Sequence, residues 1–125
     1  MPKSTYLDNK DIDHNLGTTT FTKPTAVYVG LFTTNPTAAG TGTEVTGGSY
    51  ARQAGAFSAA AAGATANTST LTWLNMPSCT ITHFAIYDAV SGGNMLYFNA
   101  LGASQVVNVG NTVTAGVGAL TVSET

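Results

Sequence analysis

Charged side chains are scarce in this sequence. They make up 8% of its 125 residues, and the formal net charge is -2 at pH 7. Between Gln53 and Ser123 the only residue with a formal charge at neutral pH is Asp88. Globular domains carry charge on about a quarter of their residues, so this surface must consist largely of Thr, Ser, Asn, Gly and Ala. Such a surface suits a subunit of an assembly better than a free monomer.

Basic residues are especially few. The chain has four, and three of them precede residue 24: the set is Lys3, Lys10, Lys23 and Arg52. A protein that binds nucleic acid needs a basic patch or groove to neutralise phosphates, and four scattered cations cannot line one. Nucleic acid is therefore not an expected partner.

Cysteine and long apolar runs are also lacking. The single cysteine, Cys79, cannot form an internal disulfide, and no neighbouring charge lowers its pKa, so we expect a buried, inert thiol. No run approaches the roughly 18 apolar residues that span a bilayer, and the N-terminus has no apolar signal-peptide core. The expected setting is the cytoplasm where the chain is made, unless it leaves within a larger particle, and no membrane partner is expected.

The N-terminal region contains the one clear helix signal. Ser4 or Thr5 can cap a helix, Asp8 lies three residues after Thr5 as in a capping box, and Gly17 supplies the terminator. The apolar stripe is thin and consists of Leu7, Ile12 and Leu16. A helix with so narrow a stripe is expected to lie on the domain or on a partner. Residues 1–25 are thus predicted to form a helix and connector arm.

The rest of the chain carries strand signals separated by turns. The segments expected to be extended are 26–33, 49–57, 70–74, 79–88, 94–100, 105–109 and 112–122. Segment 58–69 is expected to be a loop because Gly63, Thr65 and Asn67 interrupt it. The pattern predicts an all-β fold for residues 26–125: a β-sandwich or jelly roll, or a small barrel, of about seven or eight short antiparallel strands.

Side chains in a strand alternate between its two faces, so residues two apart are expected on the same face. Trp73 alternates with Leu71 and is expected to pack in the core, and four residues of the predicted hairpin are expected on one face: Phe84, Ile86, Leu96 and Phe98. Tyr28 and Tyr50 are the aromatics expected at the surface.

No catalytic constellation stands out. His83 and Asp88 are five residues apart in a predicted strand, so their side chains point to opposite faces. Glu44 with Asp88 is the only cross-domain carboxylate pair worth testing for hydrolysis of a polysaccharide, and nothing in the sequence brings the two together. The chain is therefore not expected to be an enzyme or to need a cofactor.

One acidic motif resembles the start of an EF-hand loop. Asp11, Asp13 and Asn15 have the spacing of the first three calcium ligands, but Leu16 stands where the loop needs glycine and Thr22 where it needs a carboxylate. No metal site is expected there. A solvated or partner-facing acidic helix explains the cluster better.

Glu44 and Arg52 lie eight residues apart in a Gly- and Thr-rich stretch and can pair across a folded loop. An exposed pair contributes at most about 1 kcal/mol, so the pairing matters only if it is desolvated. Burial would make both residues determinants of specificity, and the loop is interpreted as a structural clasp.

Several blocks together resemble a widespread family of small virion proteins of tailed bacteriophages. The blocks are residues 4–10, 29–40, 44–52, 82–97 and 119–122, and they cover nearly the whole chain. Members are often labelled tail fibre proteins, and similar small β-rich proteins serve as cement or decoration subunits on phage heads. The resemblance implies a virion component assembled in the host cytoplasm. Asp11 and Asn15 depart from the family pattern, where more apolar residues are expected in the helix.

The leading functional hypothesis is a capsid decoration or cement protein that bridges major capsid subunits. The alternative is a tail-fibre or receptor-binding module that contacts host glycans. The expected partners are the major capsid protein or another virion protein, and further copies of the chain in a dimer or trimer. The candidate partner-binding residues are Leu7, Asp11, Ile12, Glu44, Tyr50 and Arg52.

Overall fold

The computed structural model describes residues 3–123, which contain one helix and eight strands. The helix is α1 (Thr5–Asn15). The strands are β1 (Val27–Phe32), β2 (Gln53–Gly55), β3 (Ala64–Ala66), β4 (Leu71–Trp73), β5 (Cys79–Tyr87), β6 (Met95–Val107), β7 (Val113–Ala115) and β8 (Thr121–Ser123). The prediction of an all-β fold with a short N-terminal helix is confirmed.

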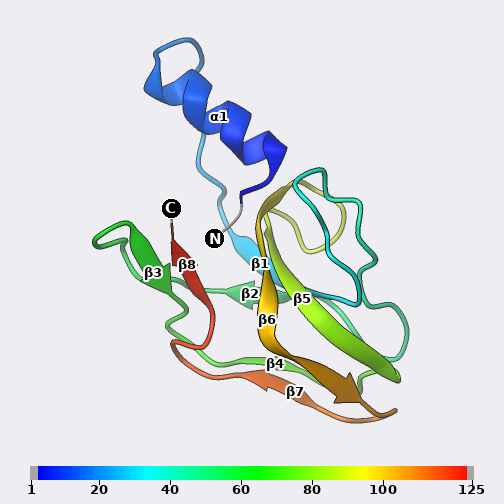
Figure 1. The fold of residues 1–125 in the computed structure, drawn as a ribbon. Helices are drawn as coiled ribbons and strands as arrows, with labels where there is room; N and C mark the ends of the chain where they lie inside the picture. Colours follow the sequence, from blue (N-terminus) through cyan, green and yellow to red (C-terminus); the bar gives the residue numbers. More distant parts are fainter. Residues whose placement is uncertain (1–2, 124–125) are drawn as a thin grey trace.

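The strands form one sheet and two ribbons, all antiparallel. The four-stranded sheet has the order β2-β1-β5-β6, while β3 pairs with β8 and β4 with β7 (Figure 1). The two ribbons lie beside one face of the sheet, and side chains from both sides meet there. The arrangement is a sandwich of one sheet against two short ribbons.

The main hydrophobic core fills the space between the sheet and the ribbons. It consists of Val29, Leu31, Val45, Leu71, Trp73, Met76, Ile81, Phe84, Ile86, Val107, Leu120 and Val122. A smaller cluster lies on the opposite face of the sheet and consists of Phe32, Ala85, Tyr87, Met95 and Phe98. Trp73 is a core residue, as predicted, with 1% of its surface exposed.

The predicted face of Phe98 is wrong. Phe98 pairs with Ala85, whereas Phe84 pairs with Asn99, so Phe98 lies on the face opposite to Phe84 and Ile86. The pairing shifts between Ile86 and Tyr87, where an irregularity interrupts the ladder. A shift of one residue exchanges the two faces of a strand, and this explains the error.

Strand β6 is longer than predicted. The segments 94–100 and 105–109 were expected to be separate, but Met95–Val107 is one strand of 13 residues. A large irregularity lies in its middle, because Ile81 pairs with Gln105 and His83 with Ala100. The residues between Ala100 and Gln105 therefore bulge out without breaking the strand, a feature that period and turn signals do not reveal.

The C-terminal region and segment 58–69 also differ from the prediction. Segment 112–122 is divided into β7 and β8 by a turn in which Gly118 has φ of 79°. Strand β3 lies inside the predicted loop and pairs with β8. Asn67 follows it and is 2% exposed. Asn67, which was expected to mark a loop, is thus buried and connects β3 to the C-terminal strands.

Candidate functional site

The candidate partner-binding residues lie in two places. Glu44, Tyr50 and Arg52, here called the clasp, lie at the edge of β1. Leu7, Asp11 and Ile12 belong to α1, which projects from the β body (Figure 1). The structure describes the surroundings of both groups, and their contact with a partner stays a prediction.

The clasp is closed by a two-point ion pair. Arg52 donates from Nε to Oε2 of Glu44 and from Nη2 to Oε1, each over 2.9 Å. Only 8% of the Arg52 side chain and 23% of the Glu44 side chain are exposed. Paired hydrogen bonds of this kind fix the geometry of both groups. The pairing expected from the sequence therefore forms, and it is largely desolvated.

Tyr50 joins the ion pair to the backbone of β1. Its hydroxyl donates to Oε2 of Glu44 over 2.6 Å and accepts from the backbone N–H of Leu31 over 2.9 Å. The ladder between β1 and β2 ends at Val29. The N–H of Leu31 lies beyond it, and so does its carbonyl, which accepts from Val45 over 2.9 Å. The clasp thus completes the edge of β1 where β2 stops.

Arg52 also reaches the turn between β5 and β6. Its Nη1 donates to the carbonyls of Ala89 (3.0 Å) and Gly92 (2.7 Å). Its guanidinium lies 3.6 Å from the ring centroid of Tyr87, which stacks on Phe32 at 6.3 Å. Cations over aromatic faces are stabilised by the ring quadrupole. One side chain therefore ties the loop, the turn and the smaller hydrophobic cluster together.

Burial shifts the protonation equilibria of these groups. Desolvation, with the hydrogen bond to Glu44, raises the pKa of Tyr50 far above its ordinary value. Desolvation alone would lower the pKa of Arg52, but the hydrogen bond and the charge of Glu44 outweigh it and raise the pKa. Burial also raises the pKa of Tyr87. The clasp therefore keeps a neutral phenol and a charged guanidinium.

The helix is fixed to the β body through its first turn. Ser4 caps it by accepting from the N–H of Leu7 over 3.1 Å, and its hydroxyl donates to the carbonyl of Met95. The N–H of Ser4 donates to Leu96 over 2.9 Å, and that of Thr5 to Ala38 over 2.9 Å. Ser4 is therefore the cap, so Asp8 lies one position beyond the capping-box site and that detail of the prediction is wrong.

The far part of the helix is left uncovered. Leu7 is 4% exposed and lies within the chain, whereas Ile12 is 56% and Leu16 76% exposed. Asp11 accepts from Nζ of Lys3 over 2.9 Å. The connector returns along the helix, because the N–H of Phe21 donates to Nδ1 of His14 over 3.1 Å. The helix is thus an arm with a firm base and an exposed apolar end.

The remaining chemical candidates have plain surroundings. Cys79 is half-buried, and desolvation raises its pKa, so the thiol stays protonated. Asp88 accepts from the backbone and side-chain nitrogens of Asn94 within the β5–β6 turn. Among residues 3–123 no group of three His, Cys, Asp or Glu side chains is placed to hold a metal ion. In the same range, no helix is long and apolar enough to cross a membrane.

Sequence reasoning missed two residues that build the clasp. Gly30 leaves the space that the clasp occupies, since a Cβ there would lie 2.8 Å from Oε2 of Glu44. Tyr87 supports the guanidinium of Arg52. The glycine inside a β-branched strand was a usable signal, because such a glycine often marks a close approach.

A family model described as Podophage GP4 fiber I protein gp80 matches residues 2–123. No curated protein matches the chain.

Proposed function

This chain belongs to the family described as Podophage GP4 fiber I protein gp80, and from that premise we propose that it is a fibre subunit of a bacteriophage virion, attached through α1. Membership makes it a phage virion structural protein. The proposal has three parts: the chain is a fibre subunit, it attaches through α1, and its role is not catalytic.

The observation that carries the proposal is the exposed end of the arm. Ile12 lies in α1, the only helix among residues 3–123, and Leu16 caps its C-terminus; the two residues are 56% and 76% exposed. An isolated helix of 11 residues is marginally stable in water, so tertiary contact normally supplies most of its stability. Here only Leu7 is buried. A second virion protein that covers Ile12 and Leu16 would supply the missing contact.

The clasp supports a structural role rather than a chemical one. Glu44 and Arg52 bond to groups of the same chain, and Asp88 bonds to Asn94. A glycosidase would need two carboxylates facing a substrate across a short gap. Glu44 and Asp88, the pair considered from the sequence, are each occupied by hydrogen bonds that shape turns and edges.

The neutral β body favours assembly with further copies of the chain. A surface with little net charge lacks the repulsion that keeps proteins apart, so self-association is favoured unless the surface is covered. Closed symmetry is the usual outcome for copies of one chain. The proposed fibre therefore contains a dimer or trimer of this protein, assembled in the host cytoplasm.

Capsid decoration is the second candidate. It is favoured by the single β body, whose sequence has no coiled-coil or collagen-like repeats from which a shaft is built. A protein that binds only the assembled shell would stabilise the head by mass action. In that case the arm would contact major capsid subunits.

Phage particles that lack this protein distinguish the two candidate functions. A fibre subunit predicts intact heads after heating and osmotic shock but reduced adsorption to cells. A decoration protein predicts the reverse. Electron cryomicroscopy of particles with a labelled copy gives its position independently, and a label confined to the head surface would contradict the fibre assignment.

Attachment through the arm is tested in the same particles. Replacing Ile12 and Leu16 by Asp should abolish incorporation into virions while the purified protein keeps its thermal stability, since neither side chain is buried. The matched control replaces Leu74 and Val109 of the β body, which are 62% and 78% exposed, by Asp and so adds the same two charges. Normal incorporation of the arm variant would rule out this mode of attachment.

A further inference from the structure

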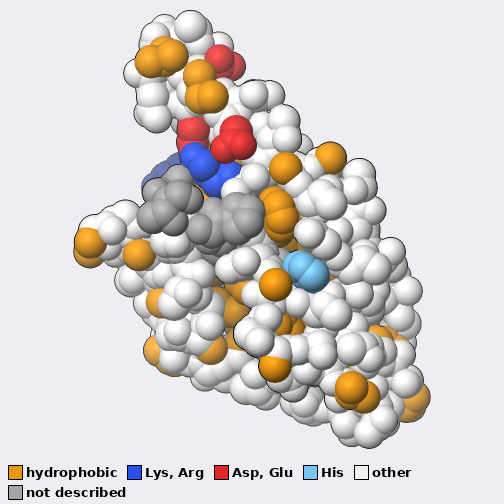
Figure 2. All heavy atoms as spheres, viewed as in Figure 1, with side chains coloured by type: hydrophobic (Ala, Val, Ile, Leu, Met, Phe, Trp, Pro, Cys, Tyr) orange, Lys and Arg blue, Asp and Glu red, His pale blue; other side chains and the backbone are white. Residues whose placement is uncertain are grey.

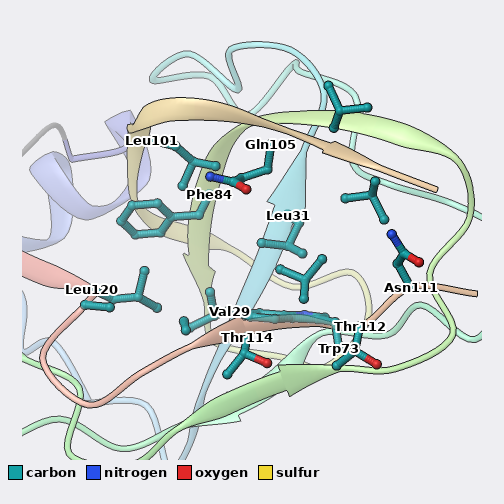
Figure 3. A pocket seen from close by; sticks show the side chains of 15 residues that line it. Val29, Leu31, Trp73, Phe84, Leu101, Gln105, Asn111, Thr112, Thr114 and Leu120 are labelled. Atoms are coloured by element: carbon teal, nitrogen blue, oxygen red, sulfur yellow. The ribbon is translucent and has the colours of Figure 1, made fainter.

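The sandwich is open along one side. Strand β6 is the last strand of its sheet and β7 pairs with β4, so within residues 3–123 no ladder joins β6 to β7. A cleft of about 370 Å³ opens between them (Figure 3). This volume lies within the range of small-molecule sites. Strand β7, which lines the cleft, lies at the end of the β body away from α1 (Figure 1), so an attached arm leaves the cleft accessible.

The lining combines an apolar interior with neutral polar groups. Leu31, Phe84 and Leu101 contribute apolar surface, and Figure 3 shows Gln105 and Thr114 on opposite walls. Among residues 3–123, no charged residue lines the cleft. The other polar lining residues include Asn111 and Thr112.

The polar side chains of the cleft are available to a ligand. Within the described part of the chain, the side chains of Gln105, Asn111, Thr112 and Thr114 make no hydrogen bond to another residue, and all four residues are exposed. Two amides and two hydroxyls supply both donors and acceptors. A ligand with several hydroxyl groups could use them together.

An unsatisfied donor lies in the same wall. Trp73 lines the cleft and is 1% exposed, and its Nε1 is the one buried side-chain nitrogen or oxygen in residues 3–123 without a hydrogen-bond partner. Buried polar groups are nearly always paired, so each exception calls for an explanation. A ligand oxygen at the inner end of the cleft would supply the acceptor.

We propose that the cleft between β6 and β7 binds a short neutral saccharide. Sugars present apolar C–H faces and hydroxyl groups together, which matches an apolar interior with amides, hydroxyls and an unpaired indole N–H. An anionic ligand would find no cation among the described residues of the lining. The biological setting of such a ligand rests on the proposed fibre function, whereas binding itself is a property of the purified chain.

The single tryptophan makes the site directly observable. The chain has one Trp, so its indole N–H gives one signal in a proton–nitrogen NMR spectrum. The full chain is titrated with glucose, galactose, N-acetylglucosamine and lactose, and with glucuronate and glucosamine as charged counterparts. At least one neutral sugar should shift the indole signal and the side-chain amides of Gln105 and Asn111 saturably, and the charged sugars should bind at least tenfold more weakly.

Two arginine substitutions localise the effect. Val106 lines the cleft and is 75% exposed, so Val106→Arg should weaken binding at least tenfold without loss of folding. Val109 is 78% exposed and does not line the cleft, so Val109→Arg should leave binding unchanged. Gln105→Ala, at an exposed position of the lining, provides a second variant if Val106→Arg misfolds.

Three results would contradict the proposed saccharide site. They are the absence of saturable shifts with every sugar, equal loss of binding in Val106→Arg and Val109→Arg, and an indole signal that moves with protein concentration when no sugar is present. The last result would mean that a second copy of the chain fills the cleft. None of these results bears on attachment through α1, which is measured by incorporation into virions.

Discussion

Among single residues, Gly30 controls whether the clasp can close. A Cβ at this position would lie 2.8 Å from Oε2 of Glu44 and 3.2 Å from the hydroxyl of Tyr50. Neither atom can withdraw without losing a hydrogen bond to the other or to Arg52 or Leu31. Gly30→Ala should therefore lower the free energy of unfolding by about 1–3 kcal/mol, as overpacking typically does. Urea denaturation measures the change.

Gly102→Ala is the matched control for Gly30→Ala. Gly102 also lies in a strand, but no heavy atom would come within 4 Å of an added Cβ. Alanine restricts the unfolded chain more than glycine does, so a neutral or slightly stabilising effect is expected. Equal effects of the two substitutions would show that the space at Gly30 is not limiting.

Tyr50 should give the stability of the protein an alkaline dependence. Burial and the bond to Glu44 raise its pKa in the folded state, whereas in the unfolded chain it ionises near pH 10. A raised folded pKa gives stability that is fully present below the unfolded pKa and declines as pH rises above it. The free energy of unfolding should therefore be higher for the wild type than for Tyr50→Phe at neutral pH, and the difference should narrow above about pH 10.

Urea denaturation of both proteins from about pH 8 to pH 11 checks this dependence. The comparison isolates Tyr50, because Tyr87 and Cys79 titrate in both proteins. Tyr6→Phe, on the helix, controls for the loss of a phenol as such. A difference that stays constant across the range would mean that the phenol of Tyr50 is not held neutral by the fold.

Among the elements, Asn67 joins β3 and β4 to the C-terminal strands. Its Nδ2 donates to Ser69 and Gly116, each over 2.9 Å, and its Oδ1 accepts from the N–H of Leu120 over 3.0 Å. Asn67→Ala would remove all three hydrogen bonds and leave the N–H of the buried Leu120 without an acceptor, at about 1–3 kcal/mol for a group that water cannot reach. The free energy of unfolding measured by urea denaturation is expected to fall by more than about 2 kcal/mol. Asn108→Ala, at an exposed position, is the control. A similar loss of unfolding free energy in both variants would show that Asn67 does not connect these strands.

Local signals predicted some elements and failed for others in a consistent way. The helix and β5 were found because a cap, a glycine terminator and a β-branched run are written in consecutive residues. Strand β3 was missed because its three residues are extended only through pairing with β8, more than fifty residues away along the chain. A contact of this kind leaves no trace in local periodicity.

The candidate site shows the same division. The ion pair of Glu44 and Arg52 was predicted, because the two charges stand near each other in a charge-poor sequence. Its other partners are the hydroxyl of Tyr50, which accepts from the N–H of Leu31, and the β5–β6 turn; only the folded chain brings Leu31 and this turn near. The cleft was not predicted at all, because it depends on β6 and β7 failing to pair.

Across the whole molecule, most charged residues lie in the N-terminal region, away from the main hydrophobic core, and the Glu44–Arg52 pair is the buried exception. On the face shown in Figure 2, basic and acidic side chains gather on the helix and at its base, while the β body is neutral. The main core draws on the sheet and both ribbons, through residues such as Ile86, Trp73 and Val122. The β body is therefore expected to unfold as one unit, with the arm outside that unit beyond its first turn.

Two probes of unfolding check this expectation. The fluorescence of Trp73 and the β signal of far-ultraviolet circular dichroism should change together in urea, as in a two-state transition. Amide hydrogens of α1 after Leu7 should exchange much faster than those of β5, because local opening of the arm exposes no core. Protection of the arm equal to that of β5 would mean that the helix is part of the cooperative unit.

The base of the arm also determines how the protein would carry a mechanical load. If a particle pulls on α1, the force reaches the β body along the covalent connector to β1 and through the hydrogen bonds of Ser4 to β6 and of Thr5 to Ala38. Strand β6 is bound to β5 along the longest ladder among the described strands. The arm should tear free at low force before the sheet yields. In single-molecule pulling from the end of α1, we expect a small early extension followed by one larger event. The early extension would dissipate part of the load before the force acts on the sheet of the β body.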